Sequence, residues 1–318
     1  MKEINNYVLI AIGGNSLIKD SKHASVEHQY SALTQTCVYI ADIIESGQKI
    51  VITHGNGPQV GFILRRSEIA YHVEGVHMTP ISLCGADTQG SIGFMIQIIL
   101  GNELLRRQIH KDIATIITRT LVDSNDKAFL EPTKPIGSFL TEEQMNSLLK
   151  NYPDWKFIED SGRGFRRVVP SPEPKKILDL EAIKTLINNG FITVAAGGGG
   201  LPVVKDDNIY KPVEAVLDKD LGSALLANEL NIKKMIISTS VDYVYLNYGK
   251  ENQRKIEFVK LEEIKKYLNE GHFAKGSMEP KIRAAINFLE GNGEVTIITS
   301  LEHLKEAFCG KFGTIITK

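Results

Sequence analysis

The chain has 318 residues, of which 42% are hydrophobic and 24% are charged, and its 37 Lys and Arg nearly balance its 38 Asp and Glu. This composition excludes an intrinsically disordered chain, which would need fewer apolar residues or a larger net charge, and it provides no basic excess for binding nucleic acid. The length fits either two ordinary domains or one large α/β domain.

Short apolar runs bounded by turn residues predict strands along the whole chain. In chain order these strands cover residues 7–12, 50–53, 113–117, 191–195, 213–217, 235–237 and 295–298. Between them lie helical patterns, in which apolar residues recur at spacings of three and four from Tyr30 to Ile44 and from Ile282 to Leu289. Strands that alternate with helices predict a mainly parallel sheet with helices on both faces.

Glycine-rich turns follow three of the predicted strands. These turns are Gly13-Gly14-Asn15, His54-Gly55-Asn56-Gly57 and Gly197 to Gly200. Open α/β sheets bind their ligands at the carboxyl ends of parallel strands, and bare backbone N–H groups there can hold an anion. Each motif alone could be a plain turn, so it is their convergence that predicts a binding site.

The segment of residues 122–174 differs from the rest of the chain. It is rich in Pro, Lys, Asp and Arg and shows little periodicity, yet it contains Trp155, the only tryptophan. We expect a small lid attached to the main sheet, because a disordered linker would not usually carry aromatic and apolar residues. Its Arg163, Arg166 and Arg167 indicate a solvated or anion-facing surface, since no wider basic face accompanies them.

Several classes of protein lose support because their motifs are absent. The sequence has no GxxxxGK[ST] phosphate loop, no HExxH or Cys/His zinc spacing and no GxSxG elbow, so we expect no metal held by protein side chains. No apolar run of about 18 or more residues predicts a membrane helix. Cys37, Cys84 and Cys309 are odd in number and widely spaced, which is typical of reduced residues in a cytoplasmic protein.

Three lysines lie close to turns or helix starts. Lys134 stands between two prolines, and Lys281 falls in the first turn of a predicted helix. Lys219 lies between Asp218 and Asp220 where another helix is expected to begin. A cation at a helix start opposes the helix dipole at a cost of a few tenths to about 1 kcal/mol, which a bound polyphosphate would reverse. Together with the glycine turns, the lysines predict a phosphoryl-transfer site, where the task is positioning and charge neutralisation.

An ordered series of motifs runs through the chain. The motifs are Ile12 to Asn15, His54 to Gly61, Thr88 to Gly93, Pro132 to Gly137, Gly162 to Gly164, Val168 to Pro172, Gly197 to Pro202, Asp218 to Asp220, Val241 to Val244, Asn247 to Gly249 and Gly271 to Ala274. In this order they resemble the carbamate kinases, of the amino acid kinase superfamily, over essentially the whole length of the chain.

The resemblance implies one domain over residues 1–318, an open three-layer α/β/α sandwich with a mostly parallel central sheet, and a protruding lid subdomain over residues 122–170. It implies reversible phosphoryl transfer between ATP and carbamate, which gives ADP and carbamoyl phosphate, with Mg²⁺ carried by the nucleotide. It also implies a cytoplasmic homodimer that binds neither nucleic acid nor membrane and makes ATP during arginine or related catabolism.

The resemblance further implies a role for each motif. Lys219 would neutralise charge on the migrating phosphoryl group, with Asp220 orienting the lysines, and Lys134 and Lys281 would contact nucleotide phosphates. Backbone and amide donors for the phosphoryl group and carbamate would come from Gly13, Gly14, Asn15, Gly55, Asn56 and Gly57. The turn of Gly197, Gly198, Gly199 and Gly200 would complete the floor of this site. The nucleotide would lie near Asp218, Lys219, Asp242, Tyr243, Tyr248, Met278 and Lys281.

Other functions share part of this pattern. A non-catalytic nucleotide sensor of the same fold would bind ATP without turnover, and a kinase of another small acid would share the glycine turns and lysines. A dinucleotide oxidoreductase would need a second strand ending in an acidic residue after Gly55-x-Gly57-x-x-x-Gly61, but a helix is expected there. Lys275 and Asp87 depart from the family pattern and could alter nucleotide affinity and carbamate positioning.

Overall fold

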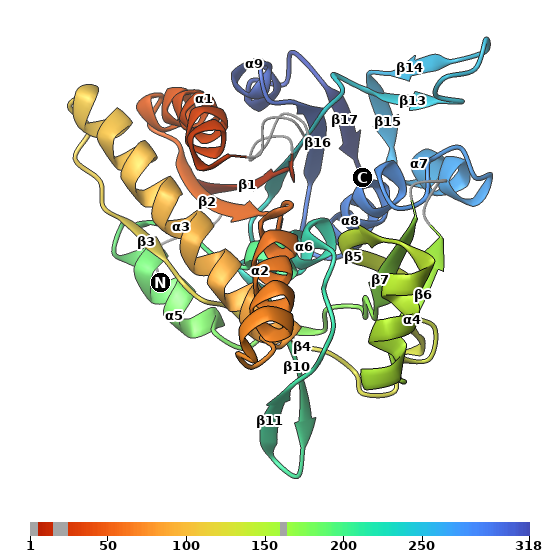
Figure 1. The fold of residues 1–318 in the computed structure, drawn as a ribbon. Helices are drawn as coiled ribbons and strands as arrows, with labels where there is room; N and C mark the ends of the chain where they lie inside the picture. Colours follow the sequence, from red (N-terminus) through yellow and green to blue (C-terminus); the bar gives the residue numbers. More distant parts are fainter. Residues whose placement is uncertain (1–5, 15–24, 160–163) are drawn as a thin grey trace.

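The computed structural model describes residues 6–14, 25–159 and 164–318, so the predictions for Asn15 and Arg163 lie outside the described residues. Its main element is an eight-stranded sheet in the order β15-β17-β16-β12-β1-β2-β9-β3 (Figure 1). All its pairings are parallel except that of β16 with β17. In chain order its strands are β1 (Tyr7–Ile12), β2 (Lys49–His54), β3 (Ile113–Thr115), β9 (Ile192–Val194), β12 (Lys234–Thr239), β15 (Phe258–Lys260), β16 (Val295–Ser300) and β17 (Thr314–Thr317).

Helices cover both faces of this sheet. The strand β1 is buried throughout, and its side chains alternate between two hydrophobic clusters, with Ile10 in one and Leu9 in the other. The cluster of Ile10 includes residues of α1, α3 and α9, and the cluster of Leu9 includes residues of α5, α6, α7 and α8. The predicted three-layer α/β/α sandwich is therefore confirmed.

The helices of the described ranges fall between the strands, as the alternating pattern predicts. They are α1 (Val26–Glu45), α2 (Gln59–Glu74), α3 (Ile81–Arg106), α4 (Glu142–Asn151), α5 (Leu180–Asn188), α6 (Lys219–Glu229), α7 (Leu261–Asn269), α8 (Met278–Glu290) and α9 (Leu304–Phe308). The two helices predicted by periodicity correspond to α1 and α8. No helix among the described residues is long and apolar enough to cross a membrane.

One strand prediction is wrong. Residues 213–217 form no strand, because the chain bends at Glu214 and its backbone makes only isolated hydrogen bonds. Val216 N, for example, donates to Pro170 O rather than to a neighbouring strand. The apolar run is buried by other contacts, because Val216 packs in a small hydrophobic cluster with Ile136 and Val169. Burial without a ladder partner thus produced the same apolar pattern as a strand.

A second, smaller sheet stands apart from the main one on the right of Figure 1. It contains β5 (Lys134–Leu140), β6 (Lys156–Glu159) and β7 (Phe165–Val169) in the order β5-β7-β6, all antiparallel, and α4 joins β5 to β6. We call residues 134–169 the outer unit. Its Arg167 is buried, with its guanidinium 3.5 Å from the ring centroid of Trp155, so this side chain does not form the solvated surface that was expected.

The remaining elements are short. A four-stranded sheet in the order β11-β10-β4-β8 contains a hairpin that projects at the bottom of Figure 1, and a separate two-stranded ribbon follows β12. These strands are β4 (Arg119–Leu121), β8 (Lys176–Ile177), β10 (Leu201–Asp206), β11 (Ile209–Pro212), β13 (Val244–Leu246) and β14 (Arg254–Ile256), and the 3₁₀ turns are η3 (Lys127–Phe129) and η4 (Gly197–Gly199).

Candidate active site

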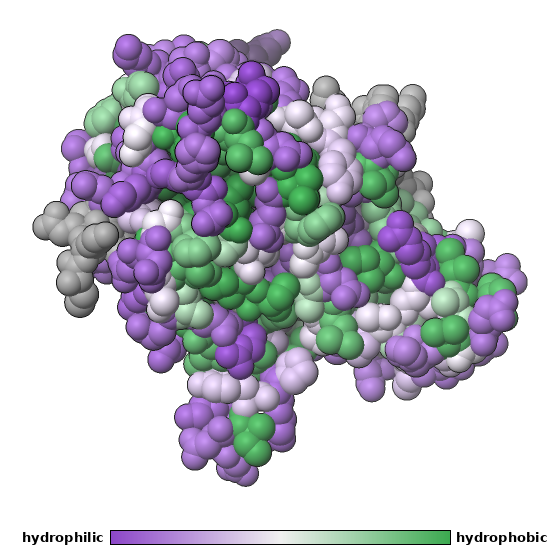
Figure 2. Space-filling model, turned by 90° about the vertical axis from the view of Figure 1, so that its left-hand side faces the viewer, coloured by the Kyte–Doolittle hydropathy of each residue, from purple (hydrophilic) through white to green (hydrophobic). Residues whose placement is uncertain are grey.

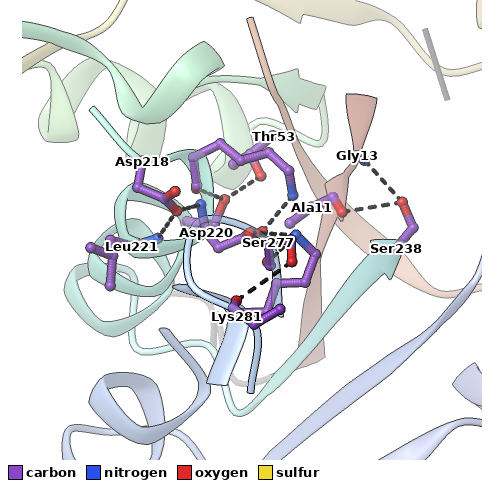
Figure 3. Close-up of polar contacts among 12 residues, drawn as sticks. Ala11, Gly13, Thr53, Asp218, Asp220, Leu221, Ser238, Ser277 and Lys281 are labelled. Atoms are coloured by element: carbon purple, nitrogen blue, oxygen red, sulfur yellow. Dashed lines mark hydrogen bonds and ion pairs between the residues drawn. The ribbon is translucent and has the colours of Figure 1, made fainter. Parts of the chain in front are cut away.

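The glycine turns meet at one edge of the main sheet. The strands β12, β1, β2 and β9 are consecutive neighbours and all run parallel, so the residues that follow them lie side by side. Gly13 follows β1, Gly55 follows β2, and the turn at Gly197 follows β9. The expected convergence is therefore present, and the end of β12 adds Ser238, whose Oγ accepts a hydrogen bond from Gly13 N at 3.0 Å (Figure 3).

The start of α6 carries the two charged residues that the sequence placed there. Asp218 is the N-cap, and its Oδ1 accepts from Asp220 N at 2.9 Å and from Leu221 N at 3.4 Å. The side chain of Lys219 runs across Gly55, where an added Cβ would lie 3.2 Å from Lys219 Cδ. A glycine at this position is thus what lets the lysine pass over the end of β2.

One carboxylate lies between two buried ammonium groups. Lys219 Nζ donates to Asp220 Oδ1, and Lys281 Nζ donates to Asp220 Oδ2 at 3.1 Å (Figure 3). The exposed fraction is 12% for the side chain of Lys219, 15% for that of Lys281 and 3% for that of Asp220. Two cations that share one anion leave a positive charge in a site shielded from water, which favours an anionic ligand.

Burial and charge shift the pKa values of this cluster. Burial lowers the pKa of Lys219, and the attraction of Asp220 does not fully offset that effect. Burial alone would raise the pKa of Asp220, but the charges of Lys219 and Lys281 outweigh it and hold that pKa below its ordinary value. Asp220 therefore stays ionised, and it orients both ammonium groups.

The outer unit contributes Lys134 to the same place. Lys134 Nζ lies 3.3 Å from Asp218 Oδ2, so the N-cap carboxylate of α6 binds backbone amides with one oxygen and this lysine with the other. The side chain of Lys134 is 36% exposed, far more than those of Lys219 and Lys281. The structure thus brings the three predicted lysines together around Asp218 and Asp220.

Only some glycines of the turns keep a backbone donor for a ligand. Gly13 N donates to Ser238 Oγ, and Gly55 N donates to Ile12 O at 3.2 Å. Gly199 N and Gly200 N likewise donate to carbonyl groups of their own turn. Donation from Gly13 and Gly55 was expected, but the amides of these two residues, like those of Gly199 and Gly200, are already paired within the protein.

The N–H groups of Gly197 and Gly198 differ, because neither has a hydrogen-bond partner among the described residues. Asn56 lies directly against Gly198, where an added Cβ would stand 2.0 Å from Asn56 Oδ1. A buried N–H without a partner is costly, so a ligand that accepts from these amides would be favoured.

The ring of His54 packs directly against Gly197 in this turn. Its ring leaves no room for a side chain on Gly197, because an added Cβ would lie 2.5 Å from His54 Nε2. Burial lowers the pKa of His54 to about 4, so its imidazole is neutral near pH 7. Its Nδ1 lies 2.8 Å from Gly55 O, a carbonyl that can only accept, so Nδ1 carries the proton. The sequence analysis gave His54 no role beyond its motif.

Two adjoining cavities open beside the lysine cluster. One, of about 510 Å³, is lined by Gly13, Gly14 and residues at the ends of β12 and β16. The other, of about 170 Å³, is lined by aromatic and apolar residues such as Tyr248 and Met278 together with several polar ones. Both are lined by Thr239, Ser240 and Lys281. The pair therefore offers a polar end and an apolar end for one elongated ligand.

The residues predicted to lie near the nucleotide divide into two groups. Tyr248, Met278 and Lys281 line the smaller cavity. Asp242 is exposed, and Tyr243 packs against Phe312 with ring centroids 4.9 Å apart, so neither lines it. Several other residues line it without having been assigned a role. Val241, His272, Phe273 and Ala274 belong to motifs of the series, whereas Thr239, Ser240, Tyr245 and Ser277 do not.

Thr239 and Ser240 could have been found from the sequence, because Ser238-Thr239-Ser240 places three hydroxyl groups directly after the predicted strand at residues 235–237.

The two departures from the family pattern lie on the surface. Asp87 is exposed on α3, and Lys275 is exposed in the loop before α8.

Comparison with known proteins agrees with this geometry. The amino acid kinase family matches residues 6–300. The chain is 49% identical over 100% of both chains to the carbamate kinase-like protein YahI of Escherichia coli, and 48% identical to carbamate kinase 2 of Staphylococcus epidermidis over 97% of this chain and 98% of that one. The structure of carbamate kinase from Giardia lamblia bound to AMP-PNP superposes with a TM-score of 0.93 at 40% identity, covering 99% of each chain. The chain belongs to the amino acid kinase family.

Proposed function

We propose that this member of the amino acid kinase family is a carbamate kinase, which transfers a phosphoryl group reversibly between ATP and carbamate. The observation that carries the proposal is the cluster of Lys219, Asp220 and Lys281 beside the amides of Gly197 and Gly198, which have no hydrogen-bond partner within the described ranges. The high identity to carbamate kinases over the full chain supports the choice of carbamate as the acceptor.

The protein's own residues would perform the transfer by positioning and charge neutralisation. The transferred group passes through a loose transition state with negative charge on its equatorial oxygens, so fixed cations and N–H donors stabilise it. Lys219 and Lys281 supply the cations, and Asp220 keeps them in place. Gly197 and Gly198 supply donors, and the side chain of Asn56, which lies against Gly198, reaches the same point.

The nucleotide would occupy the two adjoining cavities. Its base and ribose fit the smaller one, where Tyr248 and Met278 provide apolar surface, and its phosphates fit beside Lys281, which lines both. The solved Giardia carbamate kinase is described as bound to AMP-PNP, an ATP analogue, which supports nucleotide binding here.

Mg²⁺ would accompany the nucleotide and neutralise charge between its phosphates. The described residues contain no group of three or more His, Cys, Asp or Glu side chains that could hold a metal ion by themselves. Asp218 and Asp220 are already engaged with lysines. Both observations fit an ion that is held mainly by phosphate oxygens.

The outer unit would act as the lid of this site. It carries Lys134 to Asp218 through contacts that are partly exposed, and its removal would open the lysine cluster to water. Carbamate is small and reacts readily with water, so an enzyme that uses it benefits from a closed site. We propose that this lid is part of a single domain that spans residues 1–318.

The same proposal includes a homodimer that associates through α3. Exposed apolar side chains recur along this helix at Leu83, Phe94, Ile98 and Leu105, at spacings that place them on one face. Figure 2 views the molecule from the left-hand side of Figure 1, where α3 lies, and shows hydrophobic residues gathered near the middle of that face. A patch of this kind marks an interaction surface, and a Phe94→Glu variant should sediment as a monomer.

In the cell the reaction would run towards ATP as a step of arginine or related catabolism in the cytoplasm. Carbamoyl phosphate is a mixed anhydride, and its phosphoryl group is transferred to ADP with a favourable free energy. The direct test is the formation of ATP from ADP, Mg²⁺ and carbamoyl phosphate, measured for the native chain, for Lys219→Ala and for a surface control, Lys184→Ala.

We expect turnover that falls by about 10²-fold or more in Lys219→Ala, the size of effect seen when a preorganised charge stabiliser is removed, and that is unchanged in the control. ADP binding without turnover by the folded native chain would overturn the kinase proposal and favour a nucleotide sensor. Faster turnover with acetyl phosphate than with carbamoyl phosphate would replace carbamate with another small acid.

A further inference from the structure

The turn after β9 holds a strained backbone at a buried position. Ala196 has φ +48°, and Gly198, Gly199 and Gly200 have φ values of +64°, +90° and +94°. Ala196 is fully buried and is not a glycine, so its left-handed conformation costs on the order of 1–3 kcal/mol. Such a conformation persists only where the surroundings fix it, and strain of this kind concentrates at functional sites.

Three buried polar side chains fix the turn from the side of α3 and β4. Thr118 Oγ1 accepts from Ala196 N at 2.9 Å, and Thr120 Oγ1 donates to Gly199 O at 3.0 Å. Gln89 Nε2 donates to Gly197 O at 2.8 Å. All three side chains belong to residues that are at most 1% exposed, so no water competes for these bonds.

Gln89 differs from the two threonines because both ends of its amide are engaged. Its Oε1 accepts from Thr118 N at 2.8 Å while its Nε2 bonds Gly197 O. The two bonds fix the rotation of the side-chain amide, and the amide in turn fixes the carbonyl of Gly197. Gly200 N also donates to this carbonyl at 3.0 Å, so the Gly197 oxygen has two partners.

The orientation of that carbonyl determines where the next amide points. In a trans peptide the C=O of one residue and the N–H of the next lie on opposite sides of the chain. Because Gly197 O points towards Gln89 on α3, the N–H of Gly198 points away from Gln89. This N–H is one of the two in the turn without a partner among the described residues.

We propose that Gln89 is a positioning residue for phosphoryl transfer, which acts by fixing the Gly197–Gly198 peptide so that the Gly198 amide faces the transferring group. The inference rests on the proposed function, because it assigns a role within that same site. Gln89 itself lies behind the turn and touches no reacting atom. Its contribution therefore belongs to the transition state more than to nucleotide binding.

The test compares two glutamines on α3 that make the same kind of bond. Gln89→Met removes the bond to Gly197 O, and Gln97→Met removes an equivalent bond of 3.0 Å from Gln97 Nε2 to Ile113 O, away from the turn. Unfolding by urea and the kinetics of ATP formation are measured for both variants and the native chain. We expect kcat to fall about 10- to 100-fold in Gln89→Met with the KM for ADP within about threefold, and to stay near native in Gln97→Met.

A second variant keeps the proposal testable if Gln89→Met does not fold. Gln89→Glu retains an acceptor for Thr118 N, but its ionised carboxylate cannot donate to Gly197 O, whereas the protonated carboxyl can. Burial raises the pKa of a carboxyl, so the ratio of variant to native kcat should rise as the pH falls from 8 towards 5.5.

Four results are decisive. Equal kcat in Gln89→Met and Gln97→Met would overturn the positioning role, and so would a flat ratio across pH in Gln89→Glu. A loss in Gln89→Met confined to KM would assign Gln89 to nucleotide binding instead. Absence of ATP formation by the native chain would overturn the proposed function itself, which distinguishes that failure from a failure of the inference about Gln89.

Discussion

The floor of the site and the outer unit are built in opposite ways. The floor consists of the turns after β1, β2 and β9 with the start of α6, and its polar side chains, such as Thr53, Ser223 and Asp220, are at most 2% exposed. The outer unit is held to the core by the small apolar cluster around Ile136 and by a few partly exposed polar contacts. The difference indicates a preorganised floor that performs the chemistry and a weakly attached unit that can open.

The two regions are joined by the segment of residues 213–218 that leads into α6. Arg167 lies 4.0 Å from Glu214, Val216 N donates to Pro170 O, and Lys134 bonds Asp218. The segment therefore contacts the outer unit, or the residue that directly follows it, at Glu214, Val216 and Asp218. The segment leads directly into Lys219, which couples the position of the outer unit to the floor.

The largest effect should come from removing the shared carboxylate of the floor. Asp220→Asn leaves two buried ammonium groups without their counter-charge, so the free energy of unfolding should fall by about 3–5 kcal/mol and kcat by at least about 10²-fold. Urea unfolding and ATP formation measure the two quantities. Asp179→Asn, which breaks a pair with the half-exposed Arg119, should cost about 1 kcal/mol or less, and equal losses in both variants would contradict the contrast between floor and surface.

Acid should destabilise the floor through His54. The unfolded chain takes up a proton near pH 6.5, whereas burial holds the pKa of the folded His54 at about 4, so its contribution to stability is complete above pH 6.5 and is lost as the pH falls towards 4. The free energy of unfolding should fall by about 3 kcal/mol over this range. Urea unfolding of native, His54→Gln and the exposed control His77→Gln across this range should show a weaker pH dependence only in His54→Gln.

A matched pair of glycines compares the two regions directly. Gly198 and Gly137 both have positive φ, but an added Cβ would lie 2.0 Å from Asn56 Oδ1 at the former and 3.6 Å from Leu64 Cδ2 at the latter. Gly198→Ala should therefore lower kcat by about 10²-fold, because the donor and Asn56 are displaced together. In Gly137→Ala, in the outer unit, the free energy of unfolding should fall by roughly 1–2 kcal/mol, the cost of a left-handed conformation for a residue with a Cβ, and kcat should change little. A similar loss of kcat in both variants would refute the contrast.

The smallest effect should come from the lysine of the outer unit. Lys134→Met removes one partly exposed cation, so we expect the KM for ADP to rise about tenfold with little change in the free energy of unfolding. Steady-state kinetics with ADP as the varied substrate provides the measurement. The exposed Lys150 on α4 serves as the control within the same unit, and a loss of kcat as large as that of Asp220→Asn would place Lys134 in the floor.

Sequence reasoning succeeded where a local pattern has one physical meaning. The apolar run at residues 7–12 and the spacing from Tyr30 to Ile44 correspond to β1 and α1, because period and length follow directly from backbone geometry. The outer unit was expected only as an irregular lid, since the proline, glycine and charged residues within its strands break up the apolar runs that would predict them. The run at residues 213–217 was misassigned because burial without pairing leaves the same apolar signature.

By itself, the sequence determined the parallel sheet, the glycine turns at its carboxyl edge and the lysines that meet there, because each follows from residue type and order along the chain. Only the tertiary structure decided that Asp220 is shared by two lysines, and that the amides of Gly13 and Gly55 donate to groups of the protein itself. It also decided that the side chain of Gln89 bonds the carbonyl of Gly197. These depend on distances between residues that lie far apart in sequence, and a hydrogen bond depends on direction as well as on the presence of its two partners.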